Sequence, residues 1–210
     1  MSTAVEKRRN RLLRWSQRIL FAVAGLTLGY CAYFLADMWF YQKWQGRELE
    51  RLSAQESLKP PVSSQGGLAR RQAEAAAVQN GGLVGLIEIP RLGVSAMVAE
   101  GTEESTLRHA VGHIDDTALP GQAGNVGLAG HRDTFFRPLR NIRRNDIILF
   151  TTPWAHYRYR VTSTRVVTPE AVEVLRPTAN ETLTLVTCYP FYFVGSAPDR
   201  FIVRAKRIGG

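Results

Sequence analysis

The amino-acid sequence predicts an all-β domain, a small closed or nearly closed β-barrel, preceded by one N-terminal transmembrane helix and a stalk. Three observations lead to this prediction: a basic block followed by an uncharged apolar run, a linker rich in Pro, Ser and Gly, and short β-type segments broken by turn residues from Leu83 onward. The chain has 210 residues, 45% of them hydrophobic and 21% charged, which is the balance of a folded protein rather than a disordered one.

The net charge of +9 is concentrated at the N-terminus. Residues 1–18 hold six basic side chains and one acidic side chain, which gives +5, so the other 192 residues carry only +4. A nucleic-acid-binding domain carries its basic surface on the folded part of the chain. We therefore expect no nucleic-acid partner and assign residues 1–18 to a basic cytoplasmic segment.

An apolar run of eighteen residues without a charge extends from Ile19 to Ala36, and Trp39 and Tyr41 follow it closely. About 20 apolar helical residues cross the roughly 30 Å hydrocarbon layer of a bilayer, and aromatic residues gather at its interfaces. The pattern predicts a single-pass anchor in the cell membrane over residues 19–41. Because basic residues precede it, the N-terminus is expected in the cytoplasm and the following domain outside the membrane.

Three other structures share part of this pattern. A cleaved signal peptide has a shorter apolar run and a small-x-small cleavage site close behind it. A lipoprotein signal needs a small residue before Cys31, where this sequence has the bulky Tyr30. A buried core helix of a soluble protein is the third alternative.

Residues 42–81 are expected to form a stalk. Its first part, from Gln42 to Leu58, is polar with scattered leucines and is expected to form a short helix leaving the membrane. The stretch from Lys59 to Gly67 has the composition of a linker. An Ala-rich, helix-prone segment follows and ends at Asn80-Gly81-Gly82.

Residues 82–210 are predicted to form one domain, built mainly of strands. Alternation of side-chain character is clearest at 156–161 and 182–186. The expected strands are 84–89, 94–98, 125–129, 147–151, 157–167, 182–187 and 201–208, with short helical turns at 103–110 and 134–141. Seven or eight strands with little helix indicate a small barrel, long enough to bury a core without disulfides.

The two cysteines cannot pair in this arrangement, because Cys31 lies in the predicted anchor and Cys188 in the outer domain. A single cysteine in an exported domain is a reactive thiol, an intermolecular bridge or a buried inert side chain. Cys188 ends an apolar strand, a position where a side chain is exposed on a rigid support. We therefore interpret Cys188 as a candidate nucleophile.

A thiol nucleophile needs a base or a charge that favours its thiolate, and a donor for the developing oxyanion. Of the four histidines, His131 also ends an apolar strand, so two neighbouring strands would bring it and Cys188 to one rim of the barrel. Arg200 lies twelve residues after Cys188, and a hairpin would return it to the cysteine. The alternative role for Arg200 is that of a solubilising residue on an edge strand.

These residues resemble the sortase family, particularly its class D or Gram-negative type. The similarity covers about Gly82 to Ile208, and the order of the histidine, cysteine and arginine motifs makes it specific. The segment Thr184-Leu185-Val186-Thr187-Cys188 is similar to the family's TLxTC motif. Further similar segments are Asn125 to Arg132 (the histidine strand), Arg200 to Val203 (the arginine-led last strand), and the loops at Ala118 to Gly121 and Gly195 to Pro198.

The resemblance implies an eight-stranded sortase barrel that acts as a cysteine transpeptidase on exported proteins. By this resemblance Cys188 would attack the threonyl carbonyl of a C-terminal LPxTG-like sorting signal, cleaving between Thr and Gly through a thioester. His131 would act as general acid and then as general base, and Arg200 would hold the oxyanion. The residues implied to line the substrate site are Ala129, Val186 and Thr187.

The resemblance also implies partners. They are exported proteins that carry the sorting signal, and an amine acceptor from a cell-envelope precursor or a protein lysine. The segment 168–181 is similar to the family's specificity loop, and its apolar Val172, Val174 and Leu175 would receive the signal or belong to the core. We expect no cofactor, and no metal site, because Glu103-Glu104 and Asp115-Asp116 lack calcium-ligand spacing.

Other classes fit the sequence less well. An L,D-transpeptidase carries its cysteine in a Ser-x-Gly-Cys-x-Arg setting, which Cys188 lacks, and a papain-type protease has cysteine before histidine. A Ser-His-Asp hydrolase drawn from Ser196, His131 and Asp133 lacks the Gly-x-Ser-x-Gly elbow. A tethered binding barrel without turnover, and a cysteine hydrolase that passes the acyl group to water, are the remaining alternatives.

Overall fold

The structure is a computed structural model, and it describes residues 2–57, 82–193 and 195–209. The chain divides into two compact units, Met1–Tyr41 and Gln42–Gly210. The predicted linker between residues 58 and 81 lies outside the described residues.

The N-terminal part of the chain is one continuous helix, α1 (Ser2–Ser57). By length and composition, its stretch between Leu13 and Gln55 suffices to cross a membrane, and the apolar window in it is not buried in the protein. The helix therefore includes the basic segment and the first part of the expected stalk as well as the predicted anchor.

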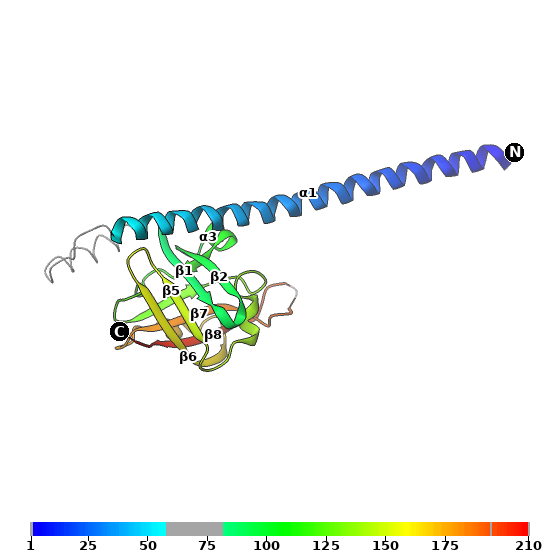
Figure 1. The fold of residues 1–210 in the computed structure, drawn as a ribbon. Coiled ribbons are helices and arrows are strands. Elements are labelled where there is room, and N and C mark those ends of the chain that lie inside the picture. Colours follow the sequence, from blue (N-terminus) through cyan, green and yellow to red (C-terminus); the bar gives the residue numbers. More distant parts are fainter. Residues whose placement is uncertain (1, 58–81, 194, 210) are drawn as a thin grey trace. The chain divides into compact units, whose positions relative to one another are not determined.

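The second unit contains a closed barrel of eight strands, in agreement with the predicted all-β class (Figure 1). The strand order is β1-β2-β3-β4-β7-β8-β6-β5, and β5 pairs with β1 to close the barrel. The strands are β1 (Leu83–Ile89), β2 (Val94–Glu100), β3 (Val111–His113), β4 (Asn125–Ala129), β5 (Ile147–Thr151), β6 (His156–Val167), β7 (Thr182–Tyr189) and β8 (Asp199–Arg207). Short helices lie between them: η1 (Pro90–Leu92), α3 (Glu104–His109), η2 (Arg137–Asn141) and η3 (Val172–Leu175).

Strand β3 is the one strand of the barrel that is missing from the strands predicted from the sequence. With three residues it is too short to show alternation. It pairs in parallel with β2 and antiparallel with β4, and so links the two halves of the barrel.

Alternating side chains of the strands fill the barrel. Leu183 and Leu185 of β7 lie in the core beside Val203 and Ala205 of β8, and Val126 of β4 joins them. The residues between them point to the outer face, because successive side chains of a strand alternate. This alternation decides which residues near the end of β7 face outward.

An ion pair joins η1 to the turn before β5. The guanidinium of Arg91 donates from Nε and Nη2 to the carboxylate of Asp146, and the backbone N–H of Arg143 donates to the same carboxylate at 2.7 Å. Arg91 also donates to the carbonyl of Asn141 at 2.7 Å. The hydrogen bond from Arg91, helped by the Arg143 N–H, lowers the pKa of Asp146 even though its side chain is largely buried.

We expect Asp146→Asn to lower the melting temperature of the full-length protein in detergent micelles by several degrees at pH 7. A carboxyl whose pKa is lower in the folded state stabilises the fold above its unfolded-state pKa, and this contribution is lost as the pH falls through the folded-state pKa. The gap between wild type and variant should therefore shrink as the pH is lowered from about 5. Fluorescence melting curves measure it, and the exposed Asp115→Asn is the control. A gap of the same size at every pH would contradict the assignment.

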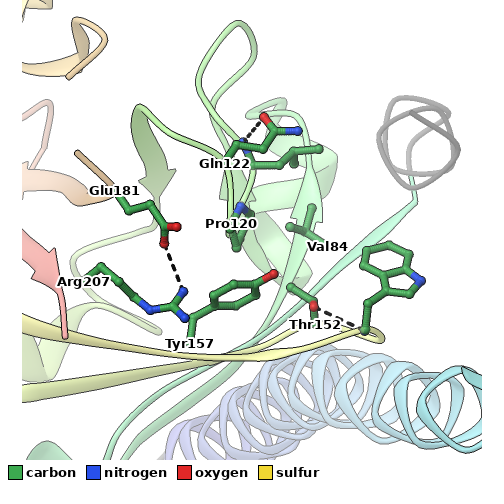
Figure 2. Close-up of a pocket in the computed structure, with 10 residues that line it drawn as sticks. Val84, Pro120, Gln122, Thr152, Tyr157, Glu181 and Arg207 are labelled. Atoms are coloured by element: carbon green, nitrogen blue, oxygen red, sulfur yellow. Dashed lines mark hydrogen bonds and ion pairs between the residues drawn. The ribbon is translucent and has the colours of Figure 1, made fainter. Parts of the chain in front are cut away.

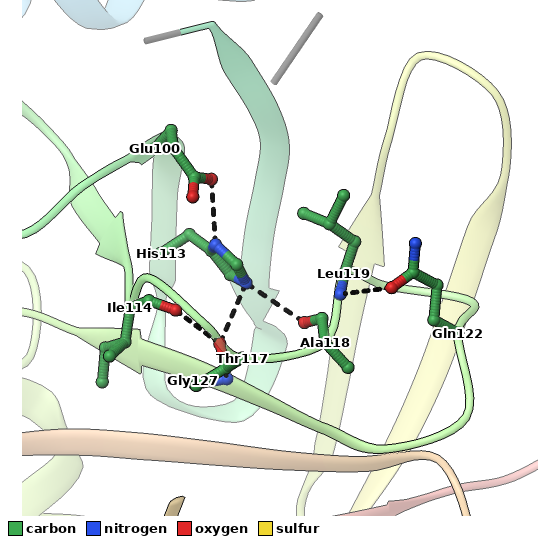
Figure 3. Close-up of polar contacts among 8 residues, drawn as sticks. All are labelled: Glu100, His113, Ile114, Thr117, Ala118, Leu119, Gln122 and Gly127. Carbon is green, nitrogen blue, oxygen red and sulfur yellow. Dashed lines mark hydrogen bonds and ion pairs between the residues drawn. The ribbon is translucent and has the colours of Figure 1, made fainter. Parts of the chain in front are cut away.

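A buried histidine joins β2, β3 and the loop before β4 (Figure 3). Nδ1 of His113 lies 2.9 Å from the carboxylate of Glu100, and Nε2 lies 3.1 Å from both the carbonyl of Ala118 and the hydroxyl of Thr117. That hydroxyl donates to the carbonyl of Ile114 at 2.6 Å and accepts the N–H of Gly127 on β4 at 3.1 Å. The ring of His113 thus lies between the Glu100 carboxylate at Nδ1 and the Ala118 carbonyl and Thr117 hydroxyl at Nε2.

His113→Ala should reduce the free energy of unfolding by roughly 2–3 kcal/mol, because it leaves the Glu100 carboxylate and the Ala118 carbonyl without this hydrogen-bond partner. Urea unfolding of the full-length protein in micelles measures the difference. The matched control is His156→Ala at an exposed histidine, which should change the value by less than about 0.5 kcal/mol. Equal effects of the two variants would show that the buried network contributes nothing.

Candidate active site

Cys188 and Arg200 are directly paired residues on the neighbouring antiparallel strands β7 and β8. Leu185 and Val203 face the core. Cys188 and Arg200 each lie three positions from one of these residues on the same strand, so they point to the outer face of the barrel. Directly opposite residues have Cβ atoms about 4.5–5.5 Å apart. Both side chains are partly exposed, and the thiol forms no disulfide.

His131 reaches the same end of the barrel through the parallel pairing of β4 with β7. Ala129 pairs with Val186, and the next residue, Gly130, is held from two sides. Its N–H donates to the carbonyl of Val186 at 3.1 Å, and its carbonyl accepts the hydroxyl of Thr187 at 2.7 Å. Parallel strands end at the same edge of a sheet, so His131 and Cys188, each two residues past the Ala129–Val186 pair, lie at one rim.

Gly130 is required where it lies. A Cβ atom at this position would come within 2.7 Å of the ring of Phe136, which is completely buried. The N–H of Phe136 donates to the carbonyl of His131 at 3.1 Å, so the segment after β4 turns back over this ring. The absence of a side chain at Gly130 thus lets the chain turn immediately before His131.

The three residues expected to line a substrate site have different places in the structure. Ala129 and Val186 are paired on the outer face and partly exposed, next to Cys188 along the sheet. Thr187 is buried, with 2% of its surface exposed, and alternation places it on the side of the sheet away from Cys188. Its hydroxyl holds Gly130, so Thr187 positions the histidine segment.

The segment between β6 and β7 covers part of the outer face. The carbonyl of Val174 in η3 accepts the side-chain amide of Asn125 at 3.0 Å and the guanidinium of Arg204 at 2.8 Å. Val174 is buried, whereas 71% of the surface of Val172 is exposed. Of the apolar residues expected either to receive the signal or to belong to the core, Val174 packs on the barrel and Val172 is open to solvent.

This segment begins beside Arg200. Val167, the last residue of β6, pairs with Arg200 across the sheet. The pKa of Glu170 is lowered, first by the hydroxyl of Thr168 and a backbone N–H, and further by the positive charge of Arg200. Arg200 itself donates to the carbonyls of Ala197 at 3.3 Å and Asp199 at 3.0 Å, which fixes its guanidinium at the strand end.

Arg132, which the sequence interpretation gave no role, fastens the loop after the cysteine to the segment after the histidine. Its guanidinium donates to three carbonyls of that loop, those of Pro190 at 3.0 Å, Phe193 at 2.8 Å and Gly195 at 2.8 Å. It also lies 5.9 Å from the ring centre of Phe193. The only signal in the sequence is a basic residue next to His131, and it says nothing of these acceptors.

Three aromatic rings support the same loop from the other side. Tyr189 and Phe191 lie 6.0 Å apart between ring centres, Tyr189 and Phe201 6.2 Å, and Phe191 and Phe201 5.3 Å. Edge-to-face and stacked rings at these separations attract one another. Cys188 is therefore followed by a loop held by aromatic packing and by Arg132.

No metal centre is found among the residues that the structure describes, since none of their His, Cys, Asp and Glu side chains form a group of three or more that could hold an ion. The chemistry available at this rim is that of a thiol, an imidazole and a guanidinium.

Arg132→Ala should increase amide hydrogen exchange at residues 191–193 and 195 at least tenfold, because all three hydrogen bonds to the loop are lost. Arg132→Lys should increase it as well, because a single ammonium cannot reproduce the planar set of donors. Exchange of the full-length protein in micelles, followed by mass spectrometry, measures the effect. Arg137→Ala, which removes an exposed arginine of the same segment, is the control. Unchanged exchange in both Arg132 variants would exclude the clamp.

Comparison with known proteins agrees with this geometry. The sequence profile of the sortase domain matches residues 87–208. Sortase D of Bacillus subtilis is 33% identical over 131 residues, which is 62% of this chain and 66% of that protein. Sortase SrtE1 of Streptomyces coelicolor is 34% identical over 142 residues, 59% of this chain and 40% of that protein. The match thus spans less than two thirds of either curated relative.

Solved structures give the same result. A sortase D5 transpeptidase of Clostridium perfringens superimposes with a TM-score of 0.58 at 31% identity, over 66% of this chain and 89% of that chain. Sortase C1 of Streptococcus suis gives a TM-score of 0.60 at 27% identity, over 75% and 93%. Since the family profile covers more than half of the sequence and the barrel matches these structures, the chain belongs to the sortase family.

Proposed function

We propose that the protein is a membrane-anchored cysteine transpeptidase that acts on exported proteins with an LPxTG-like C-terminal sorting signal. The observation that carries this proposal is the pairing of Cys188 with Arg200 at the rim where the Gly130 hydrogen bonds hold the segment of His131. Membership of the sortase family supports the reaction class.

In the first half of the reaction the thiol of Cys188 passes its proton to His131, and its sulfur attacks the carbonyl carbon of the signal's threonine. The carbonyl oxygen becomes an oxyanion, and the guanidinium of Arg200 donates hydrogen bonds to it. The Thr–Gly bond then breaks, His131 gives a proton to the leaving amine, and a thioester on Cys188 is left.

In the second half an amine from a cell-envelope precursor or a protein lysine attacks the thioester. His131 accepts the proton of that amine, the carbon–sulfur bond breaks, and the thiol is restored as the new amide forms. Water in place of the amine would give hydrolysis. The amine acceptor therefore decides between transfer and cleavage.

The sorting signal would lie on the outer face of the sheet. Ala129 and Val186 are paired there beside Cys188, and the exposed Val172 offers apolar surface on the segment between β6 and β7. Thr187 contributes indirectly, by holding the histidine segment through Gly130.

The division of the chain follows from the same proposal. Residues 1–18 would lie in the cytoplasm, 19–41 would span the cell membrane, 42–81 would form the stalk, and 82–210 would be the catalytic domain outside. The long apolar helix supports the anchor, and the basic residues before it support this orientation.

Full-length protein in micelles, mixed with an LPxTG peptide and a peptide amine, should form a peptide adduct on Cys188 that the amine discharges. Cys188→Ala should lose adduct and product completely, and Arg200→Lys should reduce kcat/KM about 10²–10³-fold, the range for loss of one oxyanion donor. His131→Ala should lose turnover, because the leaving amine then receives no proton. Intact mass and chromatography of the products measure these effects.

The other cysteine provides the matched control, since Cys31→Ser should keep full activity. If no peptide of a varied library modifies Cys188, while Cys188→Ala still binds peptide, the protein is a binding barrel and not an enzyme. A product that never contains the added amine would make the protein a hydrolase.

A further inference from the structure

The barrel contains a cavity, whose lining side chains are shown in Figure 2. The cavity has a volume of about 270 Å³, and Glu181 and Arg207 are among the residues that line it. Glu181 immediately precedes β7 and Arg207 ends β8, whereas Cys188 and Arg200 lie at the other ends of these strands. At about 3.3 Å per residue the two sites are roughly 20 Å apart, so the cavity is not part of the active site.

The charged groups of the cavity neutralise each other. Nη1 of Arg207 donates to the carboxylate of Glu181 at 3.0 Å, and the guanidinium lies 4.5 Å from the ring centre of Tyr157. An anion or a cation would have to compete with this pair for its partner. A neutral ligand would not, because a carboxylate has about four lone-pair sites and a guanidinium has five N–H donors.

Aromatic surface lies next to the ion pair. Trp154 and Tyr157 both line the cavity, and both are partly exposed while packing against the barrel core. The loop opposite is fixed against Tyr157, since a Cβ atom on Gly121, which has φ +87°, would lie 2.3 Å from the tyrosine oxygen. The side-chain carbonyl of Gln122 accepts the N–H of Leu119 at 3.2 Å, which leaves the amide NH₂ of Gln122 as a donor at the rim.

A buried hydroxyl beside the ion pair has unmet hydrogen-bonding capacity. Tyr159 follows Tyr157 on the inward-facing side of β6, and its hydroxyl has no hydrogen-bond partner among the described residues. Burial, and next the negative charge of Glu181, raise the pKa of Tyr159. Tyr159 is fully buried in the core and does not line the cavity, so its hydroxyl is not available to a ligand there.

We propose that this cavity binds one ring of a neutral sugar. A pyranose has an apolar C–H face that packs on Trp154 or Tyr157, and adjacent hydroxyl groups that bond to Glu181 and Arg207 without separating the ion pair. The mouths of β-barrels commonly hold ligands between apolar walls and a few convergent polar groups. The proposal rests on the proposed function in one respect, that the domain faces the glycans outside the membrane.

Binding at this end would leave the catalytic rim free. A glycan strand held at the mouth formed by Trp154 and Arg207 would keep the enzyme at the cell envelope while Cys188 reacts at the other end. The site would then raise the local concentration of the enzyme near its acceptor without touching the reacting atoms.

The experiment is saturation-transfer NMR on the full-length protein in lipid nanodiscs, without maltoside or glucoside detergents. The probes are the β-1,4-linked trisaccharide of N-acetylglucosamine and maltotriose, each added alone. At least one should receive saturation on the protons of one ring, and Trp154→Ala and Glu181→Gln should reduce this signal at least tenfold. Cys188→Ala should leave it unchanged, which separates sugar binding from the proposed catalysis.

Folding of the variants is checked by thermal melting followed by circular dichroism, in which Trp154→Ala and Glu181→Gln should keep a cooperative transition. If Trp154→Ala does not fold, Glu181→Gln, which keeps both aromatic rings, still tests the site by its loss of signal. Failure of both sugars to bind the wild type, or equal binding by the folded variants, would overturn the proposal. Acetate and tetramethylammonium serve as charged probes in the same experiment. If either receives saturation from the wild type and loses it in Glu181→Gln, the assignment of a neutral ligand is overturned.

Discussion

The arrangement of the candidate active site depends on the register of strand β7 with its two neighbours. On one side β7 runs parallel to β4, which places Ala129 opposite Val186 and His131 at the same rim as Cys188. On the other side it runs antiparallel to β8, which places Arg200 opposite Cys188. A shift of one residue in either pairing would turn the affected side chains to the other face of the sheet, so the buried Leu183 and Leu185 determine where the thiol points.

Much of the fold could be predicted because its signals are local. Alternation marks the strands, the uncharged run marks the long helix, and TLxTC marks the end of β7. Strand β3 was missed because three residues cannot show a period, and its pairing with β2 and β4 is set by the chain around it. The helix expected from Gln42 to Leu58 is part of α1 as far as Ser57, but its continuity with the anchor and the basic segment was not predicted, because the composition changes along its length.

In the candidate site, too, the features that local sequence determines could be predicted, and those that depend on distant parts of the chain could not. The positions of Cys188, His131 and Arg200 in the chain follow from motifs, and the register shows which of them are neighbours. The contribution of Arg132 could not be predicted, because its acceptors are three backbone carbonyls some sixty residues away. Thr187 shows the reverse case, in which a motif residue beside the nucleophile faces the interior and acts through a hydrogen bond to Gly130.

The closed barrel has a consequence for how any peptide is recognised. Every strand of the described barrel has two hydrogen-bonded neighbours, so no strand edge is free for an extended peptide to join as an additional strand. The main-chain N–H and C=O groups of a bound peptide must therefore form most of their hydrogen bonds with side chains, loop backbone or water. Its sequence preference is then set by the loops between strands, which can change in length and composition while the barrel keeps its register.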